Sequence, residues 1–304
     1  MSETAQQVRI LFLHAQTAVH PGSGTSLGAI DLPVNRERHT QWPSIPSTSL
    51  KGVLRHACWE AAGRDGSNEL LLAAFGPESP EASDHAGAIA LTDARLLAFP
   101  VRSLKGVFAW ITCPAVLERF TRDLAVAGFE PRAEVPSVAS GQVLCNSESL
   151  LIQNGKMLLE EFEFARIEDA QLLKGWPNLI ARAAHPSARE RVKTHLAVLA
   201  DDDFTYFVRN ATEIVARIGL DYELKTVRAG ALFYQEFIPA ESVFYAVVLA
   251  NRSRRKDDKT AASALLGYVE DLLSRLPTIQ VGGDETIGKG LCFARLADPK
   301  EATE

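Results

Sequence analysis

Residues 45–55 read Ile45-Pro46-Ser47-Thr48-Ser49-Leu50-Lys51-Gly52-Val53-Leu54-Arg55, a pattern typical of a loop that leads into a helix. Pro46 ends the preceding element, and a hydroxyl group can cap the first free backbone N–H groups from Ser47, Thr48 or Ser49. Apolar residues then recur at helical spacing and predict one buried stripe, made of Leu50, Val53, Leu54, Ala57, Cys58 and Ala61.

The first turn of this helix has the composition of a phosphate site. Lys51 and Arg55 lie four residues apart on the face opposite the apolar stripe. The free N–H groups of a helix N-terminus attract anions, and two cations one turn apart strengthen that attraction. The segment by itself is equally compatible with an amphipathic helix whose Lys and Arg are solvated. A second element favours nucleic acid.

That second element is Gly-rich and lies near the other end of the chain. It reads Val281-Gly282-Gly283-Asp284-Glu285-Thr286-Ile287-Gly288-Lys289-Gly290 and matches most of the P-loop pattern. However, Gly290 stands where Ser or Thr would bind magnesium, and residues 291–296 alternate like a strand instead of opening a helix. We therefore reject an NTPase. The pattern predicts a flexible loop between two strands, whose N–H groups and Lys289 can approach a phosphodiester.

These two elements resemble the RAMP superfamily of CRISPR RNA-binding proteins. Three further segments narrow the resemblance to the backbone subunit of the type III-B (Cmr) effector complex, namely Ile30-Asp31-Leu32-Pro33-Val34-Asn35-Arg36-Glu37, Thr92-Asp93-Ala94-Arg95-Leu96-Leu97-Ala98-Phe99-Pro100-Val101-Arg102-Ser103 and Gly230-Ala231-Leu232-Phe233-Tyr234-Gln235-Glu236. The matches run in one order along nearly the whole chain, and Thr48, where relatives usually carry Ser, is a minor departure.

The resemblance implies the fold and the RNA-binding residues. It implies a single RAMP-type domain over residues 1–304, of class α+β, with a ferredoxin-like (RRM-type) core and large insertions. The mixed order of predicted strands and helices, without a strict βαβ rhythm, suits that class. The RNA-binding residues expected are Arg36, Arg38, Ser49, Lys51, Arg55, Gly282, Gly283, Gly288 and Lys289.

Two segments are predicted to depart from the core. Residues 63–87 are rich in Gly, Ser, Asp, Glu and Pro and are expected to form an exposed insertion. Residues 209–235 contain two strand-like runs and predict a hairpin, which the residues alone would assign to ordinary packing on the core. In the family such a hairpin projects as a thumb that wedges into the guide–target duplex, and apolar wedges of this kind can unstack bases.

Composition sets limits on the function. The chain has 304 residues, 46% of them apolar, 23% charged, and a net charge of −6. It can bury a large core, but its acidic balance means that any RNA site must be local. A basic run at residues 252–256 is followed at once by Asp257 and Asp258, which favours a solvated loop. The four cysteines show no zinc-ligand spacing, and no apolar run approaches the length of a membrane span, so a cytoplasmic protein is expected.

The catalytic residue expected is Asp31. From the residues alone, this carboxylate would more readily balance Arg36 or Arg38 than act in catalysis. The resemblance reverses that preference, because Asp31 falls on the catalytic aspartate of the family. His20 and Glu236 are secondary catalytic candidates, although His20 also suits a polar loop and Glu236 the base of the hairpin. Because no cluster of carboxylates is evident, a divalent ion, Mg²⁺ or Mn²⁺, would be held weakly at Asp31 and completed by RNA.

The sequence therefore predicts a backbone subunit that binds guide CRISPR RNA and cleaves paired target RNA at regular intervals, with the 2′-hydroxyl as nucleophile. The expected partners are guide RNA, target RNA, further copies of the chain in a filament and the other subunits of the Cmr complex, and not a membrane. The alternative is a purely structural RNA-binding filament subunit without nuclease activity.

Overall fold

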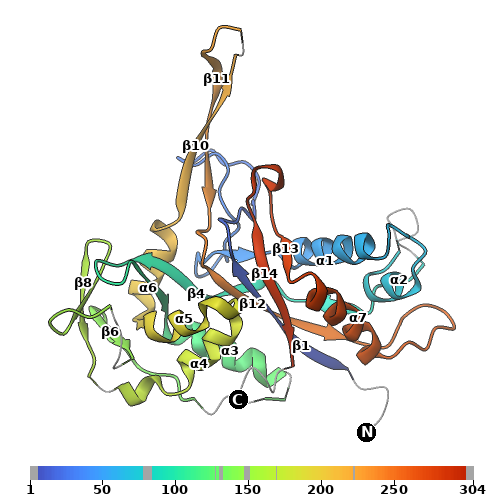
Figure 1. Cartoon of the computed structure of the whole chain (residues 1–304), viewed down its shortest axis with the longest axis horizontal. Coiled ribbons are helices and arrows are strands. Elements are labelled where there is room, and N and C mark those ends of the chain that lie inside the picture. Colours follow the sequence, from blue (N-terminus) through green and yellow to red (C-terminus); the bar gives the residue numbers. More distant parts are fainter. Residues whose placement is uncertain are drawn as a thin grey trace.

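The computed structural model describes residues 6–77, 84–126, 128–129, 133–146, 151–168, 170–221 and 223–298. Within these residues a 12-stranded mixed sheet runs through the molecule (Figure 1). Its main path follows the order β13 (Thr278–Gln280), β14 (Leu291–Ala297), β1 (Gln7–Ala15), β12 (Val243–Ala250), β4 (Ala94–Arg102), β5 (Phe108–Thr112), β9 (Leu196–Leu199), β6 (Gln142–Cys145), β8 (Phe162–Arg166) and β7 (Lys156–Leu159). Two short strands complete it, β2 (Ser44–Ile45) on β4 and β3 (Ile89–Leu91) on β12.

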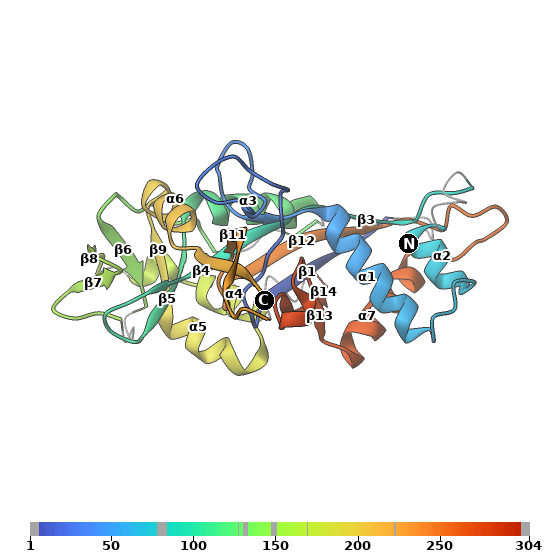
Figure 2. The same cartoon turned by 90° about the horizontal axis from the view of Figure 1, so that it is seen from above.

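One half of the sheet is covered by three helices, α1 (Ser47–Ala61), α2 (Glu69–Phe75) and α7 (Ala262–Arg275), which lie side by side (Figure 2). Strand β1 lies at the centre of this half, antiparallel to both β12 and β14. Its residues Ile10 to Leu13 are fully buried in succession, as expected for a strand covered on both faces.

Of the remaining helices, α3 (Pro114–Val126) packs on β4, α4 (Trp176–Ala183) on β1 and β12, and α5 (Arg189–His195) on β5, while α6 (Asp201–Asn210) follows β9 in the chain. Strands β5 and β9 pair in parallel, so the sheet is mixed. Short 3-10 helices cover Ala170–Leu173, Pro186–Ala188 and Glu285–Ile287. The resulting mixed architecture of strands and helices agrees with the class predicted from the sequence.

A hairpin of β10 (Glu213–Leu220) and β11 (Val227–Phe237) forms a separate two-stranded sheet that projects from the body (Figure 1). Its strands pair in antiparallel register, with Ile214 opposite Glu236 and Ile218 opposite Leu232. Large apolar side chains remain exposed along it, among them Ile214, Ile218, Leu224, Val227 and Leu232. The sequence predicts a hairpin at residues 209–235; the start differs, because residues 209 and 210 belong to α6, and β11 continues to Phe237.

Two sequence predictions about α1 and its flank require correction. The helix begins at Ser47 without a side-chain cap of its own, and the Ser47 N–H instead donates to Asp93 Oδ1 at 2.7 Å. The reason is the pairing of Ile45 with Ala94, which brings Asp93 beside the helix start. Residues 63–87 are not simply exposed, because α2 lies inside this range and buries Leu71 and Phe75. Residues 78–83 of that segment lie outside the described part of the chain.

In the described part of the chain, no helix combines the length and the apolarity needed to cross a bilayer. All four cysteines are buried, and none of them forms a disulfide. Burial raises the pKa of the Cys58 thiol and that of the Cys292 thiol to about 12, which makes both thiols unreactive.

Candidate functional site

The outer edge of β11 organises the polar groups at the base of the hairpin. This is the edge that is not paired with β10, and it is paired with the chain segment that follows β1. Leu32 N–H donates to the Tyr234 carbonyl at 3.0 Å, and Glu236 N–H donates to the Leu32 carbonyl at 3.0 Å. Further along the same edge, Val19 and Ile238 exchange two backbone hydrogen bonds. The edge is therefore paired with backbone at two points, and side chains occupy the positions beside them.

Asp31 occupies the first of these positions. The Tyr234 N–H donates to Asp31 Oδ2 at 2.7 Å, so this carboxylate takes the place that a backbone carbonyl would have in a sheet ladder. Asp31 is half-buried, and within the described residues its second oxygen makes no hydrogen bond or ion pair. That oxygen is free to accept a proton or to contact a ligand.

The pairing of Asp31 with Arg36, which the residues alone favoured, is wrong. Arg36 Nη2 lies 2.5 Å from Glu236 Oε1, and Arg36 Nη1 donates to the carbonyls of Gln41 and Val208. These contacts bury most of the Arg36 side chain, so its guanidinium is committed to the protein and is poorly placed for RNA. Arg38, by contrast, is exposed and forms no ion pair within the described residues.

Glu236 is buried, with 3% of its surface exposed, and both carboxylate oxygens are occupied. Oε2 accepts the Val34 N–H at 3.0 Å, and Oε1 accepts hydrogen bonds from Arg36 and from the Thr212 hydroxyl at 2.7 Å. A buried carboxylate with these partners fixes the base of the hairpin to α6 and to the loop after β1. Its geometry suits the anchoring alternative and offers no free oxygen for catalysis.

His20 occupies the second side-chain position on the β11 edge. Its Nδ1 lies 2.7 Å from the Glu236 carbonyl, and because a carbonyl only accepts, Nδ1 must carry the proton. The other ring nitrogen, Nε2, is thereby left for chemistry. A Cβ atom added to Gly22 would lie 2.9 Å from His20 Nε2, so glycine at this position keeps the approach to that nitrogen open.

Asp31 and His20 are therefore hydrogen-bonded to the same edge of β11, Asp31 to the backbone of Tyr234 and His20 to the backbone of Glu236, two residues further on. Two residues of extended strand span roughly 6.6 Å, so the backbone groups that hold the two side chains lie on one short stretch of this edge. Only the folded structure brings this pair together, since the hydrogen bonds join residues 20 and 31 to residues 236 and 234.

The Gly-rich loop between β13 and β14 packs on the other side of His20. Gly283 N–H donates to the His20 carbonyl at 3.0 Å, and Gly282, with φ of +86°, lies so close to this carbonyl that any Cβ would collide with it. The N–H groups of Gly288 and Lys289 are donated within the loop, to Glu285 and Asp284. The loop is thus held in place, and the N–H groups of Gly283, Gly288 and Lys289 are not free to cradle a phosphate.

The side chain of Lys289 is the group that this loop offers to an anion. Its Nζ lies 4.9 Å from the centroid of the Phe237 ring, and His20 packs on the same ring with centroids 5.5 Å apart. Arg217 from β10 approaches that ring as well, at 5.5 Å, and its Nη2 lies 3.4 Å from Asp284 Oδ1. Two cations therefore flank one buried aromatic ring, and one carboxylate balances one of them.

A second cluster of cations lies along the N-terminal half of α1. Lys51 is half-buried, and its pKa is lowered first by burial and then by the positive charges of Arg254 and Arg55. Ser49 is half-buried in the first turn of this helix. From the sequence, Arg254 was set aside as part of a solvated loop, because Asp257 and Asp258 follow the basic run. In the structure the Asp258 carboxylate instead accepts hydrogen bonds from the N–H and hydroxyl of Thr260.

Metal-ligating residues do not gather in the described part of the chain: no group of three or more His, Cys, Asp and Glu side chains is placed to hold an ion. At the hairpin base the available donors are one oxygen of Asp31 and Nε2 of His20. This pair can supply only part of a coordination sphere.

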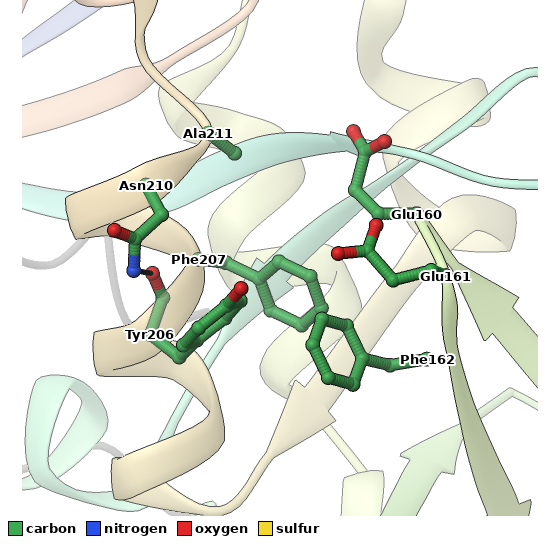
Figure 3. Close-up of a pocket in the computed structure, with 7 residues that line it drawn as sticks. All are labelled: Glu160, Glu161, Phe162, Tyr206, Phe207, Asn210 and Ala211. Atoms are coloured by element: carbon green, nitrogen blue, oxygen red, sulfur yellow. Dashed lines mark hydrogen bonds between the residues drawn. The ribbon is translucent and has the colours of Figure 1, made fainter.

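A pocket of about 230 Å³ lies apart from these clusters, between α6 and the turn that joins β7 to β8 (Figure 3). Its walls are aromatic and its rim carries two carboxylates, with a lining formed by Glu160, Glu161, Phe162, Tyr206, Phe207, Asn210 and Ala211. Because this lining contains no cation, the pocket is unsuited to a phosphodiester.

Comparison with known proteins shows the class to which the chain belongs. The RAMP superfamily matches over residues 12–292, which is most of the sequence. The chain therefore belongs to the RAMP superfamily, and the family assignment made from the sequence is confirmed.

The similar proteins are more specific. The CRISPR system Cmr endoribonuclease Cmr4 of Pyrococcus furiosus is 39% identical over 94% of both chains. The CMR subunit Cmr4 of Saccharolobus solfataricus is 28% identical over 95% of this chain and 96% of its own. The crystal structure of oligomeric Cmr4 from Pyrococcus furiosus superposes with a TM-score of 0.75 and 32% identity, covering 96% of this chain and 99% of that one. A chain of the type III-B Cmr-beta complex bound to cognate target RNA, at 22% identity and a TM-score of 0.76, shares the fold over 99% of this chain and 100% of its own.

Proposed function

We propose that the chain is a guide-RNA-binding backbone subunit of a type III-B CRISPR complex and that it cleaves the target RNA paired with the guide. The observation that carries the proposal is the arrangement of Asp31 and His20 on one edge of β11, each with one atom left free for a ligand. The 39% identity to a Cmr endoribonuclease supports the same activity.

In this mechanism the RNA supplies its own nucleophile. The free oxygen of Asp31 takes the proton of the target 2′-hydroxyl as that oxygen attacks the adjacent phosphorus, and the bond from phosphorus to the 5′-oxygen breaks. His20 acts here in its doubly protonated form: held by its Nδ1–H, it gives the proton of Nε2 to the departing 5′-oxygen and becomes neutral. The products are a 2′,3′-cyclic phosphate and a 5′-hydroxyl, and the charge that develops on the phosphate is stabilised by Lys289.

A divalent ion would fit this site only in part. The protein can offer it the free oxygen of Asp31, which would then bind the ion instead of taking the proton, so RNA oxygens and water would complete the coordination. When bound, such an ion would add positive charge beside the scissile phosphate. Mg²⁺ and Mn²⁺ are the ions that this oxygen-rich environment favours.

In this proposal the cations beside α1 and the β10–β11 hairpin contact the RNA in different ways. Lys51, Arg55 and Arg254 grip the guide backbone through phosphate contacts, while sequence is read by base pairing. The exposed apolar side chains of the β10–β11 hairpin act as the thumb that wedges the duplex. The half of the sheet around β1, with α1 and α7, corresponds to the ferredoxin-like core.

The proposed partners are guide RNA, target RNA, further copies of the chain and the other subunits of a Cmr complex. The similar Cmr4 from Pyrococcus furiosus is oligomeric in its crystal structure, which supports assembly of this chain into a filament. The alternative function remains a structural filament subunit without nuclease activity, and the free oxygen of Asp31 favours the enzyme over that alternative.

Asp31→Asn tests the enzyme against the scaffold. The amide oxygen of Asn can still accept the Tyr234 N–H, so the hairpin base stays intact while the charge and the proton acceptor are lost. We expect guide-loaded complexes to assemble and bind target normally but to cleave it roughly 100-fold more slowly or worse. Cleavage is followed with end-labelled target RNA, and the product ends are analysed for cyclic phosphate.

Asp31→Ala is the matched variant, because it also removes the hydrogen bond to Tyr234. Loss of cleavage in both variants with normal assembly supports the chemical role. Wild-type cleavage by a well-assembled Asp31→Asn complex would remove Asp31 from the mechanism and favour a structural subunit in a complex whose target cleavage is performed elsewhere.

A further inference from the structure

Asp284 joins the Gly-rich loop to the projecting hairpin. Its Oδ2 accepts a hydrogen bond from Gln235 Nε2 at 2.5 Å, and its Oδ1 lies 3.4 Å from Arg217 Nη2. Gln235 is almost fully buried, with 4% of its surface exposed, so its amide depends on a partner within the protein. Arg217 and Gln235 stand on the two different strands of the hairpin, so one carboxylate holds both.

The contact lies on a defined face of the hairpin. Side chains alternate along β11, so Gln235 and Phe237 face the Gly-rich loop, whereas Tyr234 and Glu236 project to the other face. Arg217 pairs with Phe233 across the strands and therefore shares the face of Gln235. Asp284 thus braces one face of the hairpin, and Glu236 braces the opposite face.

Three successive residues of β11 are consequently tied to the loop after β1, to the Gly-rich loop and to the segment after α6. The Tyr234 N–H is held by Asp31, the Gln235 amide by Asp284, and the Glu236 carboxylate by Arg36 and Thr212. The loop that carries Asp284 is itself fixed on the His20 carbonyl through Gly283. Asp284 therefore connects the His20 side of the site to the direction in which the hairpin projects.

A small rotation at this point has a large effect at the far end of the hairpin. From Gln235 to Val227 the strand spans eight residues, or roughly 26 Å. A rotation of about 10° at the base would displace the far end by roughly 4.5 Å over that length. Successive nucleotides of a strand are about 3.4 Å apart, so this displacement is enough to shift contacts by one nucleotide.

We propose that Asp284 is a positioning residue for target cleavage: its carboxylate locks the hairpin base against the Gly-rich loop and so fixes which phosphate reaches Asp31 and His20. The proposal rests on the proposed function. Asp284 touches neither the reacting atoms nor the RNA in this role, and acts through Gln235 and Arg217.

The backbone of Asp284 determines which substitutions are informative. Its φ of +66° lies in the left-handed region, which Gly and Asn adopt readily and Ala does not. Asp284→Gly therefore removes the carboxylate without backbone strain. Asp284→Asn keeps an oxygen that can accept from Gln235 and loses only the charge toward Arg217, so it serves as the conservative variant.

The first measurement maps the cuts in end-labelled target RNA bound to guide-loaded complexes. We expect Asp284→Gly to spread cleavage over neighbouring phosphates and to lower the rate at the principal site at least threefold, while guide affinity stays within twofold of wild type. Asp284→Asn should restore the spacing of the cuts. Cuts by Asp284→Gly that are as sharp and as fast as those of wild type would overturn the proposal.

The second measurement does not depend on cleavage. Spin labels on Leu224→Cys, in the hairpin turn, and Leu276→Cys, after α7, report the distance between hairpin and body, because both sites are exposed and the four native cysteines are buried. The distance distribution should broaden in Asp284→Gly and narrow again in Asp284→Asn. An unchanged width overturns the lock, whereas a broadened width with no cleavage even by wild type contradicts the proposed nuclease and leaves the lock supported.

Discussion

The base of the hairpin and the N-terminal half of α1 both carry cations, but they use charge in opposite ways. At the hairpin base, Arg36 is paired with Glu236 and Arg217 with Asp284. At the start of α1, Lys51 lies near Arg55 and Arg254, and the repulsion contributes to lowering the Lys51 pKa. The first region is internally balanced, and the second gains from an added anion.

Because of this difference, we expect the hairpin base to fix the positions of the catalytic groups and the start of α1 to determine the affinity for RNA. A site whose charges are satisfied by the protein can hold catalytic groups at fixed distances before RNA arrives, which is what proton transfer requires. A cluster of like charges gains stability when a phosphate enters and so contributes binding free energy. Variants at the hairpin base should therefore change the rate of cleavage, and variants at the start of α1 should change the affinity for the guide.

The largest effect is expected from His20→Asn. The Asn side-chain amide can occupy the position of Nδ1 and donate to the Glu236 carbonyl, but nothing replaces Nε2. We expect target cleavage to fall by roughly 100-fold to 10,000-fold, with guide and target affinity unchanged. Single-turnover cleavage and filter binding measure the two quantities. A variant that cuts normally would remove His20 from the mechanism, and one that loses guide binding would mean that the two regions are not separable.

A smaller effect is expected when Lys51, Arg55 and Arg254 are replaced together by Ala. The loss of three phosphate contacts should lower the slope of log affinity against log salt by about 2 for a single-stranded guide. Cleavage per bound complex should remain at the wild-type rate, because these residues take no part in the proposed proton transfers.

The control for that experiment removes three other positive charges, with Arg64, Arg102 and Arg275 replaced by Ala. These arginines are exposed, and each is already paired with a carboxylate. Their replacement should leave the salt slope nearly unchanged. Equal losses in the two triple variants would show that net charge, and not the cluster at α1, determines guide binding.

Local patterns in the sequence predicted much of the fold. Helical spacing of Leu50, Leu54 and Cys58 predicted α1, and these residues are buried. Strand-like runs predicted the hairpin strands, and the segment after Gly290 is a strand, β14, as its alternation indicated. Each of these predictions depends on neighbours a few residues apart, where periodicity carries the information.

The candidate site at the hairpin base is formed by contacts between residues that are far apart in the sequence, so only part of it could be predicted from the sequence. Asp31 was found through a family resemblance and His20 only as a secondary candidate, and their attachment to β11 joins residues more than 200 positions apart. The pairing of Arg36 with Glu236 and the role of Gly282 follow from the same long-range packing. Arg254 was assigned to a solvated loop because adjacent acidic residues in a sequence do not show which way their carboxylates point.

The smallest expected effect concerns the pH dependence of guide binding. Burial and the charges of Arg254 and Arg55 lower the pKa of Lys51 in the free protein, whereas a bound phosphate favours its protonated form. Guide affinity should therefore fall, by roughly severalfold, as the pH rises through this lowered pKa, before ordinary surface lysines deprotonate. Lys51→Arg keeps its charge over the whole range, so its affinity should stay flat. Fluorescence anisotropy with labelled guide RNA between neutral and alkaline pH measures both curves; if they coincide, Lys51 does not contact a guide phosphate.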